Sequence, residues 1–310
     1  IIYCKYCKKP IINDTTIKNI ADLFRAEGAD AWWTKDVKDF IDPSVTCECG
    51  CKEFTKEYDI MDVWFDSGVS HTAVMEQYDC LRWPADLYLE GADQYRGWFQ
   101  SSLLTSVVYK GKAPYKAVCT HGWVVDGEGR KMSKSLGNVS WAKDVIEKLG
   151  ADLVRWLMLS VHYRGELNFS DETIETARKE LDKVRTPMKQ AYIKSQLANV
   201  TVIGCDEDAV KRFIDAMNDD LNTPNGYAEI YETVKKLNQA LRQREIQWNQ
   251  VGAEVGALEK MLEVLGIRLP KVTLSEDDKQ VFAEWNAAKA AKDFAQADVK
   301  RAILIERGLM

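Results

Sequence analysis

Residues 126–138 read Asp-Gly-Glu-Gly-Arg-Lys-Met-Ser-Lys-Ser-Leu-Gly-Asn, and no other stretch of the chain is as informative. Its paired glycines predict a turn between a β-rich run at 117–125 and a mobile loop. Lys131 and Lys134 lie on that loop together with two hydroxyl groups. Donors aimed at developing charge supply a large share of catalysis, so a lysine here suits a leaving pyrophosphate. Taken alone, the five residues 131–135 are also compatible with a solvated basic turn.

The pentapeptide Lys-Met-Ser-Lys-Ser at 131–135 resembles the second signature of class I aminoacyl-tRNA synthetases, and the longer string is similar to its isoleucyl version. This resemblance implies catalytic roles for Lys131 and Lys134. It also implies that the ATP site includes both lysines and His121, Gly122, Met132, Ser133 and Ser135.

The composition is that of an ordinary soluble protein of one large or two average domains, with 310 residues, 46% hydrophobic and 29% charged. No apolar run approaches the roughly 20 residues of a membrane span, so we expect a cytoplasmic protein without a membrane partner. The chain opens with Ile1 and enters a cysteine motif at once, and we expect it to be an N-terminally truncated fragment. A net charge of −6 argues against a generally basic nucleic-acid binder but leaves room for tRNA on a local basic face.

Five of the eight cysteines fall in two clusters, Cys4-Lys-Tyr-Cys7 and Cys47-Glu-Cys49-Gly-Cys51. Such pairs on tight turns can present four thiolates tetrahedrally, as structural zinc requires. We predict Zn²⁺ ligands at Cys4, Cys7, Cys47 and Cys49, with Cys51 as an alternative to Cys49; a degenerate knuckle without metal is the other interpretation. An amphipathic helix, capped by Asn13 and Gly28, completes a predicted subdomain at 1–57.

The next segment, 58–150, reads as a strand-helix-strand unit. An apolar strand at 87–89 ends at Glu90, a helix follows from about 93 to 109, and the next strand runs over 116–125. Ligands of open parallel sheets lie outside the carboxyl ends of the strands, so Glu90 is placed to meet one.

Residues 90–99, Glu-Gly-Ala-Asp-Gln-Tyr-Arg-Gly-Trp-Phe, resemble the isoleucyl adenylate-binding motif, and 62–68, Asp-Val-Trp-Phe-Asp-Ser-Gly, are similar to its partner segment. The resemblance implies that either Glu90 or Asp93 accepts the substrate ammonium and that two tryptophans wall the side chain. On periodicity alone, both tryptophans would be core residues. The implied adenylate-binding set is Glu90, Gly91, Asp93, Gln94, Trp98 and Trp64.

The sequence departs from the family pattern in two places. Tyr95 stands where the family usually has histidine, which removes a group that titrates near neutrality. No His-Ile-Gly-His-type segment, the first ATP-binding signature, occurs in the 310 residues. We therefore expect this chain alone to be inactive.

From Trp141 onward the pattern is helical and predicts an antiparallel bundle over 151–310. Segments at 159–171, 213–224 and 287–298 resemble the helical anticodon-binding domain of the cysteinyl enzyme.

The predicted fold class is therefore α/β: part of a Rossmann-like class I synthetase catalytic domain with a small zinc knuckle, followed by an all-α bundle. The resemblance implies ATP-dependent activation of isoleucine and its transfer to tRNA by a monomer that uses ATP with Mg²⁺ and a structural Zn²⁺. Two alternatives stay open: a cysteinyl-type enzyme, and a non-catalytic tRNA-binding or regulatory paralogue.

Overall fold

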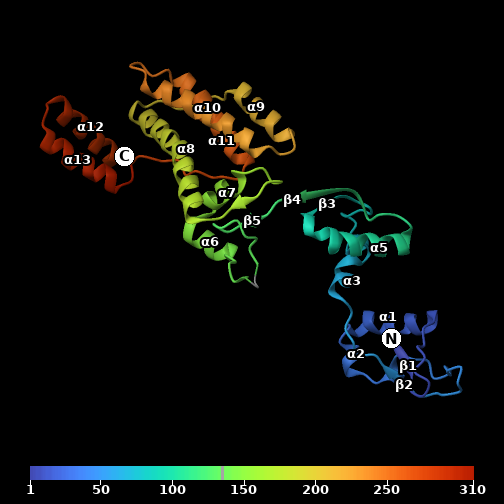
Figure 1. Ribbon diagram of the computed structural model, residues 1–310. Helices are drawn as coiled ribbons and strands as arrows, with labels where there is room; N and C mark the ends of the chain where they lie inside the picture. The colour runs from blue at the N-terminus through green and yellow to red at the C-terminus, as the bar shows by residue number, and fades with distance from the viewer. Residues whose placement is uncertain (134–135) are drawn as a thin grey trace. The chain divides into compact units, whose positions relative to one another are not determined.

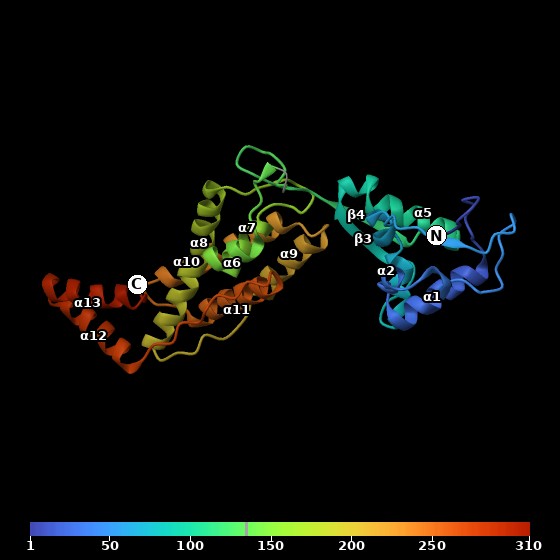
Figure 2. The same cartoon turned by 90° about the horizontal axis from the view of Figure 1, so that it is seen from below.

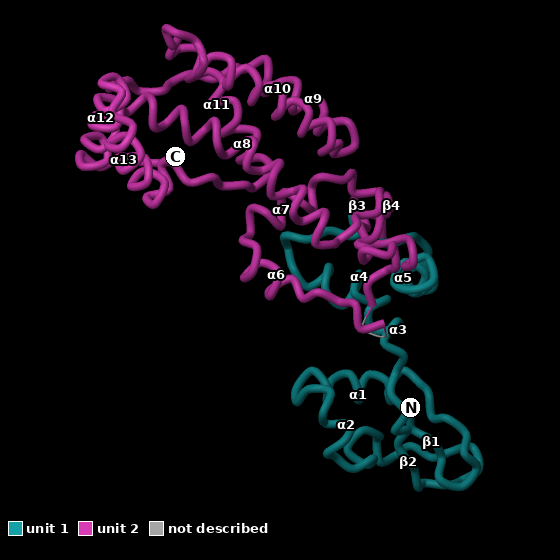
Figure 3. The backbone as a smooth tube through the Cα atoms, turned by 60° about the vertical axis from the view of Figure 1, so that its left-hand side comes forward, with its two compact units in different colours: residues 1–85, 95–114 teal, residues 86–94, 115–310 magenta. Residues whose placement is uncertain are grey.

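The computed structural model describes residues 1–133 and 136–310, which form two compact units (Figure 3). Unit 1 comprises residues 1–85 and 95–114, and unit 2 comprises residues 86–94 and 115–310. Within the described ranges, every helix is too short or too polar to cross a membrane.

Unit 1 begins with a small two-stranded antiparallel sheet in which Ile2 lies opposite Lys56. Helices and single turns lie between its two strands in the chain and follow the second strand (Figure 1). The elements are β1 (Ile2–Cys4), α1 (Asp14–Glu27), α2 (Ala31–Thr34), η1 (Val37–Asp39), β2 (Phe54–Lys56), α3 (Val63–Gly68), α4 (Ser70–Ala73), η2 (Met75–Gln77) and α5 (Trp98–Lys110).

Helix α1 confirms the predicted caps. The Asn13 side chain accepts a hydrogen bond from the backbone N–H of Thr16, and the chain leaves the helix at Gly28 with φ +83°. The apolar face of α1 packs on the knuckle core, where Phe24 meets the rings of Trp32 and Phe40 edge to face. This packing gives the first subdomain a core of its own.

Two short elements link the units along the chain, namely β3 (Ala85–Gly91) and η3 (Ala92–Arg96). Strand β3 is hydrogen-bonded to β4 (Tyr115–His121), and α5 lies between them in sequence. This order agrees with the predicted strand-helix-strand unit. The predicted strand over 116–125 is interrupted, because Gly122 turns away and donates its N–H to Tyr163 O at 2.8 Å.

Unit 2 continues with a second small sheet and a helical bundle. Strands β5 and β6 pair in parallel, with Val124 opposite Leu167. The elements are β5 (Val124–Val125), α6 (Ala142–Leu149), α7 (Ala151–Leu159), β6 (Leu167–Asn168), α8 (Asp171–Leu197), α9 (Glu207–Asn218), α10 (Thr223–Arg242), α11 (Trp248–Val264), α12 (Glu276–Ala290) and α13 (Phe294–Glu306).

The bundle core is formed by α7 to α11, which lie side by side in Figure 1 and Figure 2. Trp156 is fully buried there and stacks on Tyr227 at a centroid distance of 4.2 Å. Helices α12 and α13 form a hairpin whose separate apolar core reaches Ile193 of α8. The sequence pattern predicts one helix over 277–308, whereas the chain turns at Lys292 with φ +57°.

Candidate functional site

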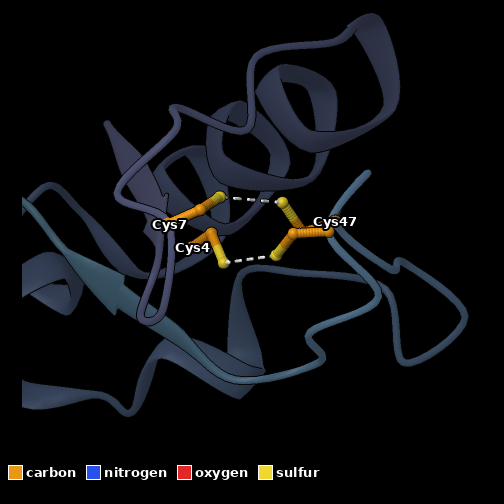
Figure 4. A group of neighbouring side chains, drawn as sticks. Cys4, Cys7 and Cys47 are labelled. Atoms are coloured by element: carbon orange, nitrogen blue, oxygen red, sulfur yellow. Dashed lines mark hydrogen bonds between the residues drawn. The ribbon is translucent and has the colours of Figure 1, made fainter.

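The two cysteine clusters meet in unit 1. Cys4 ends β1, Cys7 follows on a tight turn, and Cys47 and Cys49 lie on a second turn closed by the Gly50 N–H to Cys47 O hydrogen bond. Their four sulfur atoms all lie within 4.8 Å of one another. Figure 4 shows Cys4, Cys7 and Cys47 pointing toward a common centre.

This geometry fits a tetrahedral metal ion. The Sγ atoms of Cys4 and Cys49 are 3.6 Å apart, and those of Cys7 and Cys47 are 3.5 Å apart. Four ligands at the usual Zn–S distance stand about 3.8 Å from each other, so an ion needs little rearrangement. Cys51 is not part of the cluster, since its sulfur instead accepts a hydrogen bond from Glu53 N at 3.3 Å.

The Cys4 thiol is already biased toward the ligating form. The backbone N–H of Cys7 is the main cause, and it lowers the pKa of Cys4 to about 6 against the opposing effect of burial. Thiolates, not thiols, bind metal. The spacing of the four sulfur atoms suits a soft divalent ion such as Zn²⁺, which would bind all four cysteines as thiolates.

A second set of side chains gathers in unit 2 where β3 and β4 end. Glu90 is the penultimate residue of β3 and His121 the last residue of β4, and the Glu90 Oε1 to His121 Nε2 distance is 3.4 Å. The imidazole Nδ1 lies 2.8 Å from Gly122 O. Both side chains are partly exposed, so they face a ligand-accessible edge of the sheet.

Trp123 forms the surface against which this site is built. A Cβ atom on Gly91 would lie 2.6 Å from the Trp123 ring, so only glycine permits this close approach. The ammonium of Lys131 stands 3.5 Å from the centroid of the same ring. It also donates a hydrogen bond to Asp93 Oδ2 at 3.1 Å. Lys131, Asp93 and Trp123 are thus brought together from three segments.

The loop that carries Lys131 is organised by Asp126. Its carboxylate accepts hydrogen bonds from the backbone N–H groups of Glu128 and Arg130, from the Arg130 guanidinium and from the Asn138 amide, at 2.9–3.0 Å. The Asn138 amide is the main cause that holds the pKa of Asp126 well below its usual range. The two ends of the signature loop are thereby tied to one ionised side chain.

The other residues predicted for the ATP site lie on or beside this loop. Met132 donates its N–H to Val124 O at 3.4 Å, and Ser133 donates its N–H to Asn138 Oδ1 at 2.9 Å. Lys134 and Ser135, also predicted for this site, lie outside the described residues.

The predicted adenylate-binding residues divide between the two units. Gln94 follows Asp93 in η3 and belongs to unit 2 with Glu90, whereas Trp64 and Trp98 belong to unit 1. Trp98 begins α5 and donates its indole N–H to Ser67 O at 3.0 Å, which fastens it to α3. Trp64 also lies on α3, and 47% of it is exposed.

The sequence reasoning assigned no role to Trp123, Asp126 or Asn138. The aspartate had a local signal, because Asp before a Gly-x-Gly segment is typical of a side chain that closes a turn on its own backbone. For Trp123 no local signal indicates its partners, which lie about 30 residues before it and 8 residues after it.

Comparison with known proteins places these features in a family. Residues 2–170 match the tRNA synthetases class I (I, L, M and V), and residues 212–270 match the DALR domain. The first match covers more than half of the chain and includes both the cysteine cluster and the Glu90–Lys131 region.

Curated relatives with high identity are named isoleucine--tRNA ligase. The protein of Caldanaerobacter subterraneus subsp. tengcongensis is 54% identical over 185 residues, and that of Caldicellulosiruptor bescii is 55% identical over 186 residues. Each alignment covers 60% of this chain and 20% of the relative. The chain thus spans about a fifth of the length of these relatives.

A solved structure has the same fold over most of the chain. It is agnB2 LeuRS of Agrobacterium radiobacter K84, in a ternary complex with tRNA and LeuAMS. The match has a TM-score of 0.59 at 19% identity and covers 84% of this chain and 36% of the other. With the match over residues 2–170, these findings establish that the chain belongs to the class I tRNA synthetases of the I, L, M and V group.

Proposed function

We propose that the full-length gene product is an isoleucine--tRNA ligase, which activates isoleucine with ATP and transfers it to tRNA(Ile). The observation that carries the proposal is the pairing of Glu90 with His121 and of Asp93 with Lys131, which lies over Trp123, where β3 and β4 end. The identity of 54% to a protein named isoleucine--tRNA ligase supports isoleucine as the substrate.

In this proposal the carboxylates bind the amino acid, and the lysines stabilise the leaving pyrophosphate. Glu90 or Asp93 accepts a hydrogen bond from the ammonium of isoleucine, while Trp98 and Trp64 pack against its aliphatic side chain. Lys131 and Lys134 stabilise the charge that develops on pyrophosphate as it leaves, which is where fixed donors contribute most.

The remaining site residues hold the substrates. The binding site for ATP with its Mg²⁺ includes His121, Gly122, Met132, Ser133 and Ser135. The binding site for the adenylate includes Gly91 and Gln94.

The cysteine cluster holds a structural Zn²⁺. The helical tail, which matches the DALR domain over residues 212–270, binds tRNA. The enzyme acts in the cytoplasm as a monomer.

The half-exposed ion pair between Lys131 and Asp93 is consistent with these roles. Their side chains are 50% and 49% exposed, and such surface pairs are worth only about 0–1 kcal/mol. An incoming phosphate or ammonium can therefore replace either partner at little cost.

The test is isoleucine-dependent ATP–pyrophosphate exchange by the full-length gene product. Glu90→Gln should lower kcat/KM for isoleucine strongly, whereas Glu147→Gln on exposed helix α6 should leave it unchanged. Equal activity of the Glu90 variant and the wild type would refute the assigned site. Binding of tRNA without any exchange would favour the non-catalytic paralogue.

A further inference from the structure

The turn between α9 and α10 adopts an unusual backbone. Asp220 and Leu221 have φ +56° and +54°, a left-handed conformation that few residues other than glycine adopt. Two such residues in a row cost free energy that the surrounding contacts must offset. The side-chain contacts of Asp220 supply that restraint.

Asp220 is held by three consecutive residues of the loop that follows α7. The Tyr163 hydroxyl donates to Asp220 Oδ1 at 2.6 Å, and Arg164 donates to Oδ2 at 2.8 Å and to Oδ1 at 3.3 Å. The His162 ring nitrogen Nε2 lies 3.0 Å from the Asp220 carbonyl. The Arg164 guanidinium is the main cause that lowers the pKa of Asp220 to about 2, so the carboxylate is ionised at neutral pH.

The same loop is bonded to the strand end that carries the candidate site. The N–H of Gly122 donates to Tyr163 O at 2.8 Å. A Cβ atom on Gly122 would lie 1.9 Å from Gly165 O, so the two backbones touch without intervening side chains. The Cys119 thiol, on β4, also lies 3.3 Å from the Tyr163 hydroxyl.

Gly122 has a site residue on each side. His121 precedes it and meets Glu90, and Trp123 follows it and lies under Lys131. A continuous series of contacts therefore runs from the helical tail through the 162–165 loop to the candidate site. All of these residues belong to unit 2.

We propose that Asp220 is a positioning residue for amino-acid activation: from the α9–α10 turn it fixes the 162–165 loop, which in turn fixes Gly122 and the orientations of His121 and Trp123. The helical tail thereby controls the geometry of the activation site. This inference rests on the proposed function of that site, and its test measures the energetic coupling directly.

The first experiment is amide hydrogen exchange of the full-length gene product, read at the peptide that contains Gly122. Asp220→Asn is the informative variant because asparagine tolerates the left-handed backbone but loses the charge that Arg164 binds. The matched control is Asp219→Asn, at the adjacent exposed position. We expect faster exchange at Gly122 in the Asp220 variant and unchanged exchange in the control. Unchanged exchange in both variants would overturn the proposal.

The second experiment measures ATP–pyrophosphate exchange by the same variants. We expect Asp220→Asn to raise KM for isoleucine about three- to thirtyfold, the usual range for coupling through contact networks, with Asp219→Asn unchanged. Tyr163→Phe should raise KM in the same direction, and the double variant should be less impaired than the product of the two effects. Loss of folded enzyme alone would lower kcat and leave KM unchanged, and that result would refute the positioning role.

The two experiments separate this proposal from the proposed function. If the wild type shows no ATP–pyrophosphate exchange with isoleucine, the proposed function fails. Amide hydrogen exchange at Gly122 still decides whether Asp220 restrains the end of β4.

Discussion

The Lys131 ammonium has two partners among the described residues, and it binds both weakly enough to exchange them. The Trp123 ring attracts the ammonium without neutralising it, and the Asp93 carboxylate is half exposed. The ammonium is therefore held in place at a small free-energy cost. In the proposed function, a cation held in this way can move to a phosphate oxygen of ATP.

The position of Lys134 in the signature sequence gives a quantitative prediction for its substitution. In the full-length gene product, Lys134→Ala should slow isoleucyl-adenylate formation about 100- to 1,000-fold, the usual effect of removing one donor that acts in the transition state. The affinity for isoleucine should stay nearly constant, because the charge is used mainly as pyrophosphate separates. Rapid-quench kinetics and equilibrium binding measure the two quantities separately. Lys143→Ala, on exposed helix α6, is the matched control, and an equal loss of ATP affinity and of rate would contradict the assigned role.

The sequence motifs predicted the chemical role of single residues but not the residues that contact them. Glu90 and Lys131 were both predicted as site residues; in the structure Glu90 meets His121, and Lys131 lies over the ring of Trp123, two residues further along the chain. The contact of Trp123 with Gly91 could not be predicted, because it depends on how the chain runs on from the paired ends of β3 and β4. The Asp220 contacts to 162–164 lie 56–58 residues apart in sequence, and no local pattern indicates them.

The cysteine knuckle is an element whose folding we expect to depend on metal. Purified without chelator, the protein should contain one zinc ion per chain, measured by elemental analysis. Removal of the ion should increase amide exchange within about the first 55 residues and leave the helical bundle protected, because metal binding supplies folding energy locally. Cys49→Ser should abolish tight binding, whereas Cys51→Ser should not, since only Cys49 belongs to the cluster. Protein that contains no zinc would refute the prediction.

The α12–α13 hairpin should be sensitive to acid. Arg307 binds both Asp277 and Asp278, and it is the main cause that lowers the pKa of Asp278 to about 2. A carboxyl whose pKa falls on folding stabilises the folded form at pH values above its usual pKa of 3.8, and this stabilisation is lost as the pH falls toward 2.

The protection of 276–306 against amide exchange, relative to the intrinsic exchange rate at each pH, should therefore fall between about pH 4 and pH 2 in the wild type. Arg307→Ala should reduce that dependence and leave the part due to the Ser275 hydrogen bonds, whereas Arg301→Ala, on α13, should keep it in full. A wild-type hairpin with the same protection across this range would contradict the assignment.

Helix ends were predictable where a capping residue marked them, as at Asn13 and Gly28. Breaks within a uniform helical or strand pattern could not be predicted. The alanine-rich pattern over 277–308 continues through the turn at Lys292, so periodicity could not reveal two helices. The strand over 116–125 is interrupted at Gly122 by a hydrogen bond to Tyr163, which is a tertiary contact.

The chain as a whole joins a class I synthetase segment to a helical region that matches the DALR domain. The sequence resembles the isoleucyl enzyme in its first part and the cysteinyl enzyme in its tail. Amino-acid selection depends on the residues around the reacting carboxylate, so we assign it to the first part. The tail is then expected to select the tRNA.

ATP–pyrophosphate exchange by the full-length gene product, with isoleucine, valine and cysteine compared side by side, tests this assignment most directly. We expect isoleucine to exceed valine by about 10- to 200-fold in kcat/KM, because one methylene in an apolar pocket is worth only about 1–3 kcal/mol. Cysteine should be activated poorly, because the described residues around Glu90 include no group of thiolate ligands for a metal. A clear preference for cysteine over isoleucine would contradict the account and transfer the identity of the enzyme to its helical tail.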